Sequence, residues 1–189
     1  RQMCIRDRYY AMHPLAERDL PMAPEMTLAI ARRESEFDPR VQSQVGARGL
    51  MQIMPRTGNE VARRLGRGLE HTTERLTSDP VYNAELGAAD LATLARRFSG
   101  NVIMMSAGYN AGPSRPDRWM GVYGDPRRGE IDIVDWIEHI PFRETRNYVM
   151  RVTESLPVYR ALLEKEPLPE PFSDELTGSS LQAFAPKGE

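Results

Sequence analysis

Residues 79–98 carry the clearest structural signal in the chain, DPVYNAELGAADLATLARRF. Asp79 followed by Pro80 is a helix start signal, because aspartate can cap free backbone N–H groups and proline fits the first helical turn. Behind this start, apolar residues recur every three or four positions, at Val81, Ala84, Ala88, Leu91, Ala95 and Phe98. We therefore predict a core helix that ends at Gly100.

Similar signals predict helices on both sides of this one. A helix begins near Pro24 and stops before the Asp38–Pro39 pair, so Glu34 lies in its last turns. Further helices are expected from Pro55 to about Leu65 and from Val102 to the breaker sequence at 110–113. The glycines of residues 45–49 suit a tight loop or a short hairpin.

The second half of the chain gives weaker signals. Residues 114–129 are rich in proline, glycine and arginine, which predicts a surface loop with one short helical turn at most. Residues 133–138 are expected to be helical. A longer helix follows Pro141, with Tyr148, Val152 and Leu156 along one face, and Pro157 should kink or restart it.

These elements predict a mainly α fold with little or no β structure and a single globular domain over residues 21–165. Residues 1–20 are expected to be irregular, and Arg1–Arg8 resembles a truncation or an assembly scar because it matches no helix cap or targeting pattern. The polar tail at 166–189 is expected to be flexible, since it offers too little apolar surface to fold alone.

Composition excludes several classes of function. A formal net charge of −2 gives no field that would attract nucleic acid. The single cysteine, Cys4, cannot form an internal disulfide, and the scattered histidines lack ligand spacing, so we expect no metal and no cofactor. No stretch approaches the roughly 20 apolar residues of a membrane span.

Four blocks carry residues suited to chemistry, in the order ARRESEFDP (31–39), VGARGLMQIMP (45–55), AGYNAGP (107–113) and IPFRETRNYV (140–149). Together they resemble the motifs of the family 1 lytic transglycosylases, whose goose-lysozyme-like domain forms the C-terminal part of soluble lytic transglycosylases. The resemblance runs from about Pro24 to Leu163 and is specific because four blocks recur in order. Gly108 departs from it, since the family often has alanine there.

The resemblance implies a lysozyme-like helical fold and a catalytic acid/base at Glu34. A glutamate that must hold a proton near neutrality needs burial or a nearby carboxylate to raise its pKa above about 4.3. Two other acidic residues compete for this role. Glu36 points to a different helix face, and Asp38 precedes a proline and is expected to shape the turn.

Ser43, Gln52, Met54 and Tyr109 match family positions that line the substrate cleft. A hydroxyl or an amide can hydrogen-bond a sugar, and methionine offers an adaptable apolar wall. Two alternatives stay open from the residues themselves: core packing for Met54, and a structural amide that satisfies the backbone for Gln52.

The resemblance also implies that Glu144 faces the cleft, although an ion pair with Arg146 or Arg143 explains it equally well. Tyr148 lies one turn further along the same face. It either lines the cleft wall or packs as a core tyrosine.

The implied reaction cleaves the β-1,4 bond between N-acetylmuramic acid and N-acetylglucosamine and forms a 1,6-anhydro product. Peptidoglycan glycan strands are therefore the expected partner, with a periplasmic or cell-envelope location and a monomeric state. Two rival functions remain: a goose-type muramidase that delivers water to the sugar, and a non-catalytic glycan-binding module.

Overall fold

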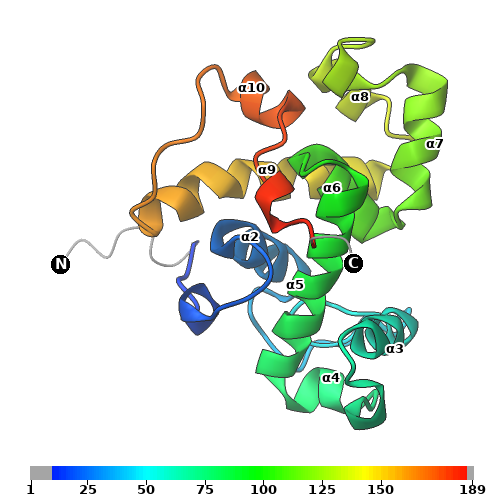
Figure 1. Ribbon diagram of the computed structural model, residues 1–189, viewed down its shortest axis with the longest axis vertical. Coiled ribbons are helices and arrows are strands. Elements are labelled where there is room, and N and C mark those ends of the chain that lie inside the picture. The colour runs from blue at the N-terminus through cyan, green and yellow to red at the C-terminus, as the bar shows by residue number, and fades with distance from the viewer. Residues whose placement is uncertain (1–9, 187–189) are drawn as a thin grey trace. The chain divides into compact units, whose positions relative to one another are not determined.

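The computed structural model describes residues 10–186, and these residues fold almost entirely as helices (Figure 1). In this part of the chain the only β structure is a pair of isolated bridges, Gln42 with Arg48 and Arg48 with Ile53. The predicted mainly helical fold is confirmed.

The chain divides into two compact units, Arg1–Asp90 and Leu91–Glu189, with the boundary inside helix α5 (Pro80–Arg97). The single domain expected over residues 21–165 stays a prediction.

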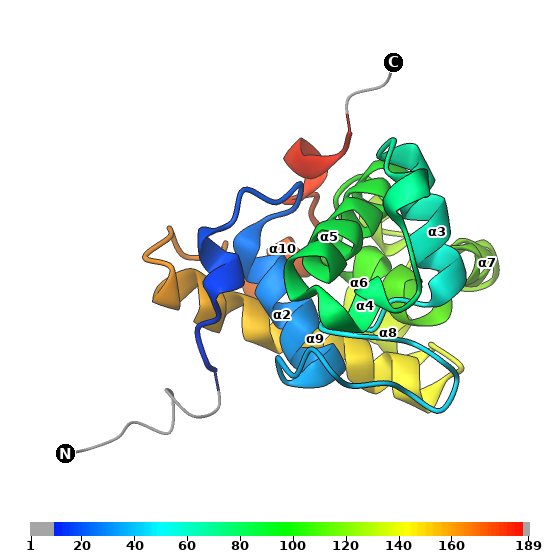
Figure 2. The same ribbon diagram turned by 90° about the horizontal axis from the view of Figure 1, so that it is seen from below.

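The first unit contains short helices joined by tight loops: η1 (Pro14–Glu17), α2 (Pro24–Ser35), α3 (Pro55–Arg64), η2 (Gly68–Glu70), α4 (Arg75–Ser78) and the start of α5. Pro24, Pro55 and Pro80 each open a helix, where a missing N–H costs no intrahelical bond. Both views place α3 and α4 beside the start of α5 (Figures 1 and 2). The predicted starts near Pro24, Pro55 and Pro80 are confirmed.

The buried face of α5 is wider than the predicted seam. Ala84 and Ala88 are fully buried as expected, whereas Val81 is only partly buried. Tyr82 and Asn83 are buried instead, at 1% and 0% exposure. The buried face of α5 thus includes a polar asparagine.

The prediction for residues 1–20 needs correction where the structure describes them. Pro14–Glu17 forms the 3-10 helix η1, capped by the Nδ1 atom of His13, which accepts the Leu15 N–H at 3.2 Å. Leu15 is 3% exposed and η1 packs against α2, so burial orders a segment that lacks a local helix signal. Cys4 and the Arg1–Arg8 stretch lie outside the described residues.

The second unit is built around the apolar helix α6 (Val102–Ala111). It packs against the long α9 (Arg143–Leu162), against α7 (Ser114–Tyr123) and against α10 (Phe172–Thr177). The shorter elements η3 (Pro126–Arg128), α8 (Ile133–Glu138) and η4 (Gln182–Phe184) complete the unit. The helices predicted from Val102 and over 133–138 are confirmed.

The prediction of a loop over residues 114–129 is wrong, because Ser114–Tyr123 is the helix α7. Pro116 occupies its first turn, where no intrahelical N–H bond is lost. Pro116 and Trp119 are both buried. Burial of these two side chains stabilises the helix α7, which the local sequence does not predict.

Helix α9 likewise runs through Pro157 as one element, although the sequence predicted a kink or a restart. The proline removes one backbone hydrogen bond. Val152, Leu156 and Tyr159 are buried around it at 0–2% exposure, and their packing offsets that loss.

The predicted flexible tail is also corrected. Helix α10 packs against α6 and α8, and Leu181 is 5% exposed. The Nδ2 atom of Asn101 donates to the carbonyls of Leu176 and Gly178, both at 2.9 Å. Hydrogen bonds to the backbone therefore hold this segment, which apolar content alone could not reveal.

Among residues 10–186, no helix combines the length and apolar character needed to cross a bilayer.

Candidate active site

Glu34 lies on the last turn of α2, as predicted, and its side chain is half-buried. The chain turns immediately afterwards, because Glu36 and Phe37 both adopt left-handed backbone conformations, with φ of 51° and 66°. The Phe37 ring stacks on the His13 imidazole with 5.1 Å between ring centroids. Such strained conformations persist only where neighbours hold them, and they are frequent at functional sites.

Ser35 ties the end of α2 to the loop that follows. Its hydroxyl donates to the Leu50 carbonyl at 2.7 Å and lies 3.2 Å from the Ala31 carbonyl. Ser35 directly follows Glu34. The position of the Glu34 backbone is thus linked to the loop at residue 50.

The predicted tight loop at 45–49 is confirmed. The Ser43 hydroxyl oxygen accepts the Ala47 N–H at 2.9 Å, and the Ser43 N–H donates to the Ala47 carbonyl at 2.9 Å. Since a hydroxyl that accepts one hydrogen bond still has a proton to donate, Ser43 keeps a donor for a ligand.

Gln52 has a structural role through its amide nitrogen. This nitrogen donates to the carbonyls of Val41 (3.0 Å) and Gly49 (2.9 Å), and the Gln52 backbone is left-handed with φ of 47°. The structural alternative for this residue therefore holds for its nitrogen. A ligand contact would have to use the carbonyl oxygen of the side chain.

Met54 is 40% exposed at the N-cap of α3, so the core-packing alternative for this residue is wrong.

The structure also places the two acidic residues that compete with Glu34 for the catalytic role. Asp38 accepts the Arg40 N–H at 2.9 Å and shapes the turn, as predicted, and Glu36 is exposed.

Asn83 is a buried polar residue of α5 that was not among the site residues predicted from the sequence. Its side-chain oxygen accepts the Met51 N–H at 2.8 Å, and its nitrogen donates to the carbonyls of Arg48 (2.9 Å) and Leu76 (2.8 Å). The residue is fully buried. An asparagine on the apolar face of the core helix is the sequence signal that could have revealed it, since a buried amide requires partners.

In the second unit, Tyr109 lies half-buried near the end of α6. The residue before it, Gly108, has no space for a side chain, because a Cβ atom there would lie 2.9 Å from the Phe98 ring. This contact accounts for glycine where the family often has alanine.

Asn110 connects the end of α6 to the start of α9. Its side-chain oxygen accepts the Thr145 hydroxyl at 2.7 Å, and Thr145 is 2% exposed. Since these residues directly follow Tyr109 and Glu144, the bond brings the backbone segments of two predicted site residues together.

Glu144 is exposed, and Arg146 instead donates to the Glu138 backbone carbonyl at 2.7 Å. Within residues 10–186 no ion pair of Glu144 with Arg143 or Arg146 is present. Tyr148 is 2% exposed, which agrees with the core-tyrosine alternative.

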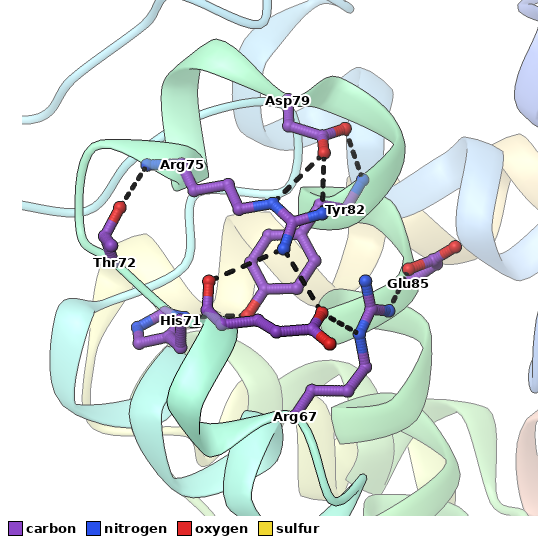
Figure 3. Close-up of polar contacts among 8 residues, drawn as sticks. Arg67, His71, Thr72, Arg75, Asp79, Tyr82 and Glu85 are labelled. Carbon is purple, nitrogen blue, oxygen red and sulfur yellow. Dashed lines mark hydrogen bonds and ion pairs between the residues drawn. The ribbon is translucent and has the colours of Figure 1, made fainter.

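A dense polar cluster surrounds Tyr82 at the start of α5 (Figure 3). The Nδ1 atom of His71 lies 2.9 Å from the Tyr82 hydroxyl. Burial lowers the pKa of His71, and the charge of Arg75 lowers it further. The pKa of Asp79 is also lowered, chiefly because its carboxylate accepts the Tyr82 backbone N–H.

We predict a loss of stability on mild acidification that depends on His71. Because its folded pKa is below the unfolded value of about 6.5, the stability it contributes is present above that pH and lost as pH falls toward the folded pKa. The Tm should therefore fall less between pH 7 and pH 5.5 in His71→Gln than in the wild type, measured by thermal unfolding. Comparing the two proteins cancels the contributions of the other titrating groups to the pH dependence of the Tm.

An unchanged dependence in His71→Gln would contradict the prediction.

Comparison with known proteins identifies the family. A family model, the transglycosylase SLT domain, matches residues 16–130, more than half of the 189-residue chain. The chain belongs to this family. The matched part of the SLT domain contains Glu34, Ser43, Gln52, Met54 and Tyr109.

Relatives of this SLT domain are lytic transglycosylases. The soluble lytic murein transglycosylase of Escherichia coli (strain K12) is 40% identical over 140 residues, which cover 74% of this chain and 21% of the relative. The crystal structure of the 70 kDa soluble lytic transglycosylase of Escherichia coli matches with a TM-score of 0.72 and 33% identity, over 94% of this chain and 25% of that one. The predicted lysozyme-like helical fold is confirmed by this match.

A second solved structure is an inactive mutant of the lytic transglycosylase Slt from Pseudomonas aeruginosa, in which glutamine replaces a glutamate. It matches with a TM-score of 0.67 and 33% identity, over 89% of this chain and 25% of that one. The chain thus spans about a fifth to a quarter of the length of these relatives.

Within the described residues, no group of three or more His, Cys, Asp or Glu side chains is placed to hold a metal ion.

Proposed function

We propose that this chain is a lytic transglycosylase that cleaves the β-1,4 bond between N-acetylmuramic acid and N-acetylglucosamine in peptidoglycan. The observation that carries the proposal is the family match over residues 16–130, which includes Glu34. The inactive mutant of the Pseudomonas aeruginosa relative, made by a glutamate-to-glutamine change, supports a glutamate as the essential group.

Glu34 acts first as an acid and then as a base. Its protonated carboxyl donates a proton to the glycosidic oxygen as the bond from that oxygen to the anomeric carbon breaks. The resulting carboxylate accepts the proton of the muramyl 6-hydroxyl, and this oxygen bonds to the anomeric carbon. No water is consumed, and Glu34 ends protonated again.

One catalytic carboxylate is sufficient for this sequence of steps. Most glycosidases place a second carboxylate across the bond. Here the 2-acetamido group of the substrate or nearby dipoles stabilise the positive charge that develops on the sugar. The exposure of Glu36 and the turn bond of Asp38 support leaving both residues out of the chemistry.

The substrate-binding roles are assigned to side chains with remaining hydrogen-bonding or apolar capacity. Ser43 donates its hydroxyl proton, Gln52 offers its side-chain oxygen, and Met54 provides an exposed apolar surface. Tyr109 and Glu144 are also assigned to substrate binding. Tyr148 supports them mainly by packing, as its burial suggests.

The substrate implies action in the periplasm or cell envelope. All the residues assigned above belong to one chain, so the activity requires no second copy and we propose that the chain acts as a monomer.

Product analysis tests the proposed reaction. Purified peptidoglycan is digested with the protein, and the muropeptides are identified by mass spectrometry. Products that carry 1,6-anhydromuramic acid, lighter by one water than hydrolysed ends, are expected because the 6-hydroxyl closes the ring. Hydrolysed ends alone would indicate a muramidase, and binding without cleavage would indicate a glycan-binding module.

A further inference from the structure

We propose that Asn83 is a positioning residue for Glu34: its side-chain amide fixes the loop Arg48–Met51, and this loop holds the end of α2 through Ser35. The inference rests on the function proposed for Glu34, and it adds a residue outside the sequence blocks identified above.

The first link is the amide of Asn83, which uses its oxygen and both N–H groups at once. The oxygen accepts from Met51, and the nitrogen donates to Arg48 and Leu76. A rotated amide would place N–H groups against the Met51 N–H and an oxygen against two carbonyls. Only one orientation therefore satisfies these buried groups, and the loop has one position relative to α5.

The second link is the Leu50 carbonyl, which accepts the Ser35 hydroxyl at 2.7 Å. Leu50 lies between the two loop residues that Asn83 binds. Leu50 and Met51 are both fully buried, so the loop between these contacts has no room to relax. A displacement of the loop would reach Ser35 and, through the backbone, Glu34.

The third link is the anchoring of the start of α5 around Tyr82, the residue that precedes Asn83 in the sequence (Figure 3). Asp79 caps the helix by accepting the Tyr82 N–H at 3.0 Å. The guanidinium carbon of Arg75 lies 4.0 Å from the centroid of the Tyr82 ring, and that of Arg67 lies 4.8 Å from it.

Charged partners hold these two arginines in turn. Arg75 pairs with Asp79 at 3.1 Å, and Arg67 pairs with Glu85 at 2.5 Å. Tyr82 directly precedes Asn83 in the sequence. The polar cluster around Tyr82 therefore also fixes the backbone position of Asn83 and of its side-chain amide.

This arrangement predicts an effect on catalysis beyond stability. Asn83 is neutral, so it acts through geometry. A misplacement of about 1 Å caused by a distant mutation can cost on the order of 10²-fold in rate. Loss of the amide should therefore lower kcat more than it raises KM.

The chain contains a matched control in Asn101. This asparagine is also fully buried, accepts one backbone N–H (Met104, 3.0 Å) and donates to two backbone carbonyls. Asn83→Ala and Asn101→Ala thus remove the same chemical group, fully buried and with the same number of backbone hydrogen bonds. Asn83 binds the loop Arg48–Met51, whereas Asn101 caps α6.

Both variants are expected to lower the Tm by similar amounts. At a temperature where both are folded, kcat on peptidoglycan should be about 10- to 100-fold lower in Asn83→Ala than in Asn101→Ala. The pH profile of kcat should also shift in Asn83→Ala alone, because the surroundings of the acid/base change. Equal kcat values and equal pH profiles in the two variants would overturn the proposal.

Ser35→Ala provides a second route if Asn83→Ala does not fold, since it removes the Leu50 bond and leaves Asn83 intact. It should shift the pH profile in the same direction, and an unshifted profile would contradict the proposal. Where both variants fold, their effects on kcat should be less than additive, because they act through one loop.

Glu34→Gln completes the panel. If it keeps activity, the proposed function of Glu34 fails. If it is inactive while Asn83→Ala behaves like Asn101→Ala, only the positioning role fails.

Discussion

Replacing Glu34 by glutamine is expected to lower the turnover of peptidoglycan by at least about 10²- to 10⁴-fold, because a positioned acid/base contributes that much and Glu34 serves in both steps. Glutamine has nearly the shape of glutamate but neither donates nor accepts the proton. The rate of anhydro-product formation under saturating substrate is the measurement.

Glu36→Gln is the matched control for this result. It makes the same chemical change two residues away, on an exposed residue that caps α2. The control should keep activity within a few-fold of the wild type. Both variants should unfold near the wild-type Tm, which separates a chemical loss from a folding defect. Equal activity of the two variants would remove Glu34 from the mechanism.

Gly49→Ala is expected to cause the largest loss of stability, on the order of 4 kcal/mol or more. Gly49 is left-handed with φ of 76°, and a Cβ atom there would lie 2.0 Å from the Leu76 carbonyl oxygen and 2.5 Å from the Asn83 side-chain nitrogen. The substitution therefore forces apart the contacts that hold the loop. Chemical denaturation of the purified variant measures the change in the free energy of unfolding.

Gly46→Ala separates the two causes of this effect. Gly46 belongs to the same loop and is also left-handed, with φ of 92°, but a Cβ atom there would meet nothing within 4 Å. It should cost only about 1–2 kcal/mol of backbone strain. Equal losses of unfolding free energy in the two variants would mean that the close contact at Gly49 does not affect stability.

The loss at Gly49 should extend to catalysis. Its carbonyl accepts bonds from both the backbone and the side chain of Gln52. A displaced residue 49 would disturb Gln52 and the Asn83 amide together. Any Gly49→Ala protein that still folds should therefore have lower activity than Gly46→Ala.

Much of the fold follows from the sequence because its signals act within a few residues. Pro24, Pro55 and Pro80 mark helix starts through a fixed φ angle and a missing N–H. The same local reasoning puts Glu34 on the last turn of its helix, and the structure agrees.

Within the candidate site, the residue types and their order could be predicted from the sequence. The hydrogen-bond partners of each side chain could not. The structure shows that the amide nitrogen of Gln52 bonds the backbone and that Met54 is exposed. The sequence alone had left open a structural role for Gln52 and core packing for Met54. Asn83 was missed because its partners lie 7 to 35 positions away along the chain.

The sequence by itself determined that the chain is mainly helical, where most helices begin, and that Glu34 lies in the last turn of the first long helix. Caps, prolines and periodicity are local properties, so they can be read from neighbouring residues. Only the tertiary structure decided that Ser114–Tyr123 is a helix, that α9 continues through Pro157 and that the segment around Leu181 is ordered. Each of these outcomes depends on burial or hydrogen bonding between residues far apart in the chain, and such long-range contacts leave no pattern in the nearby residues.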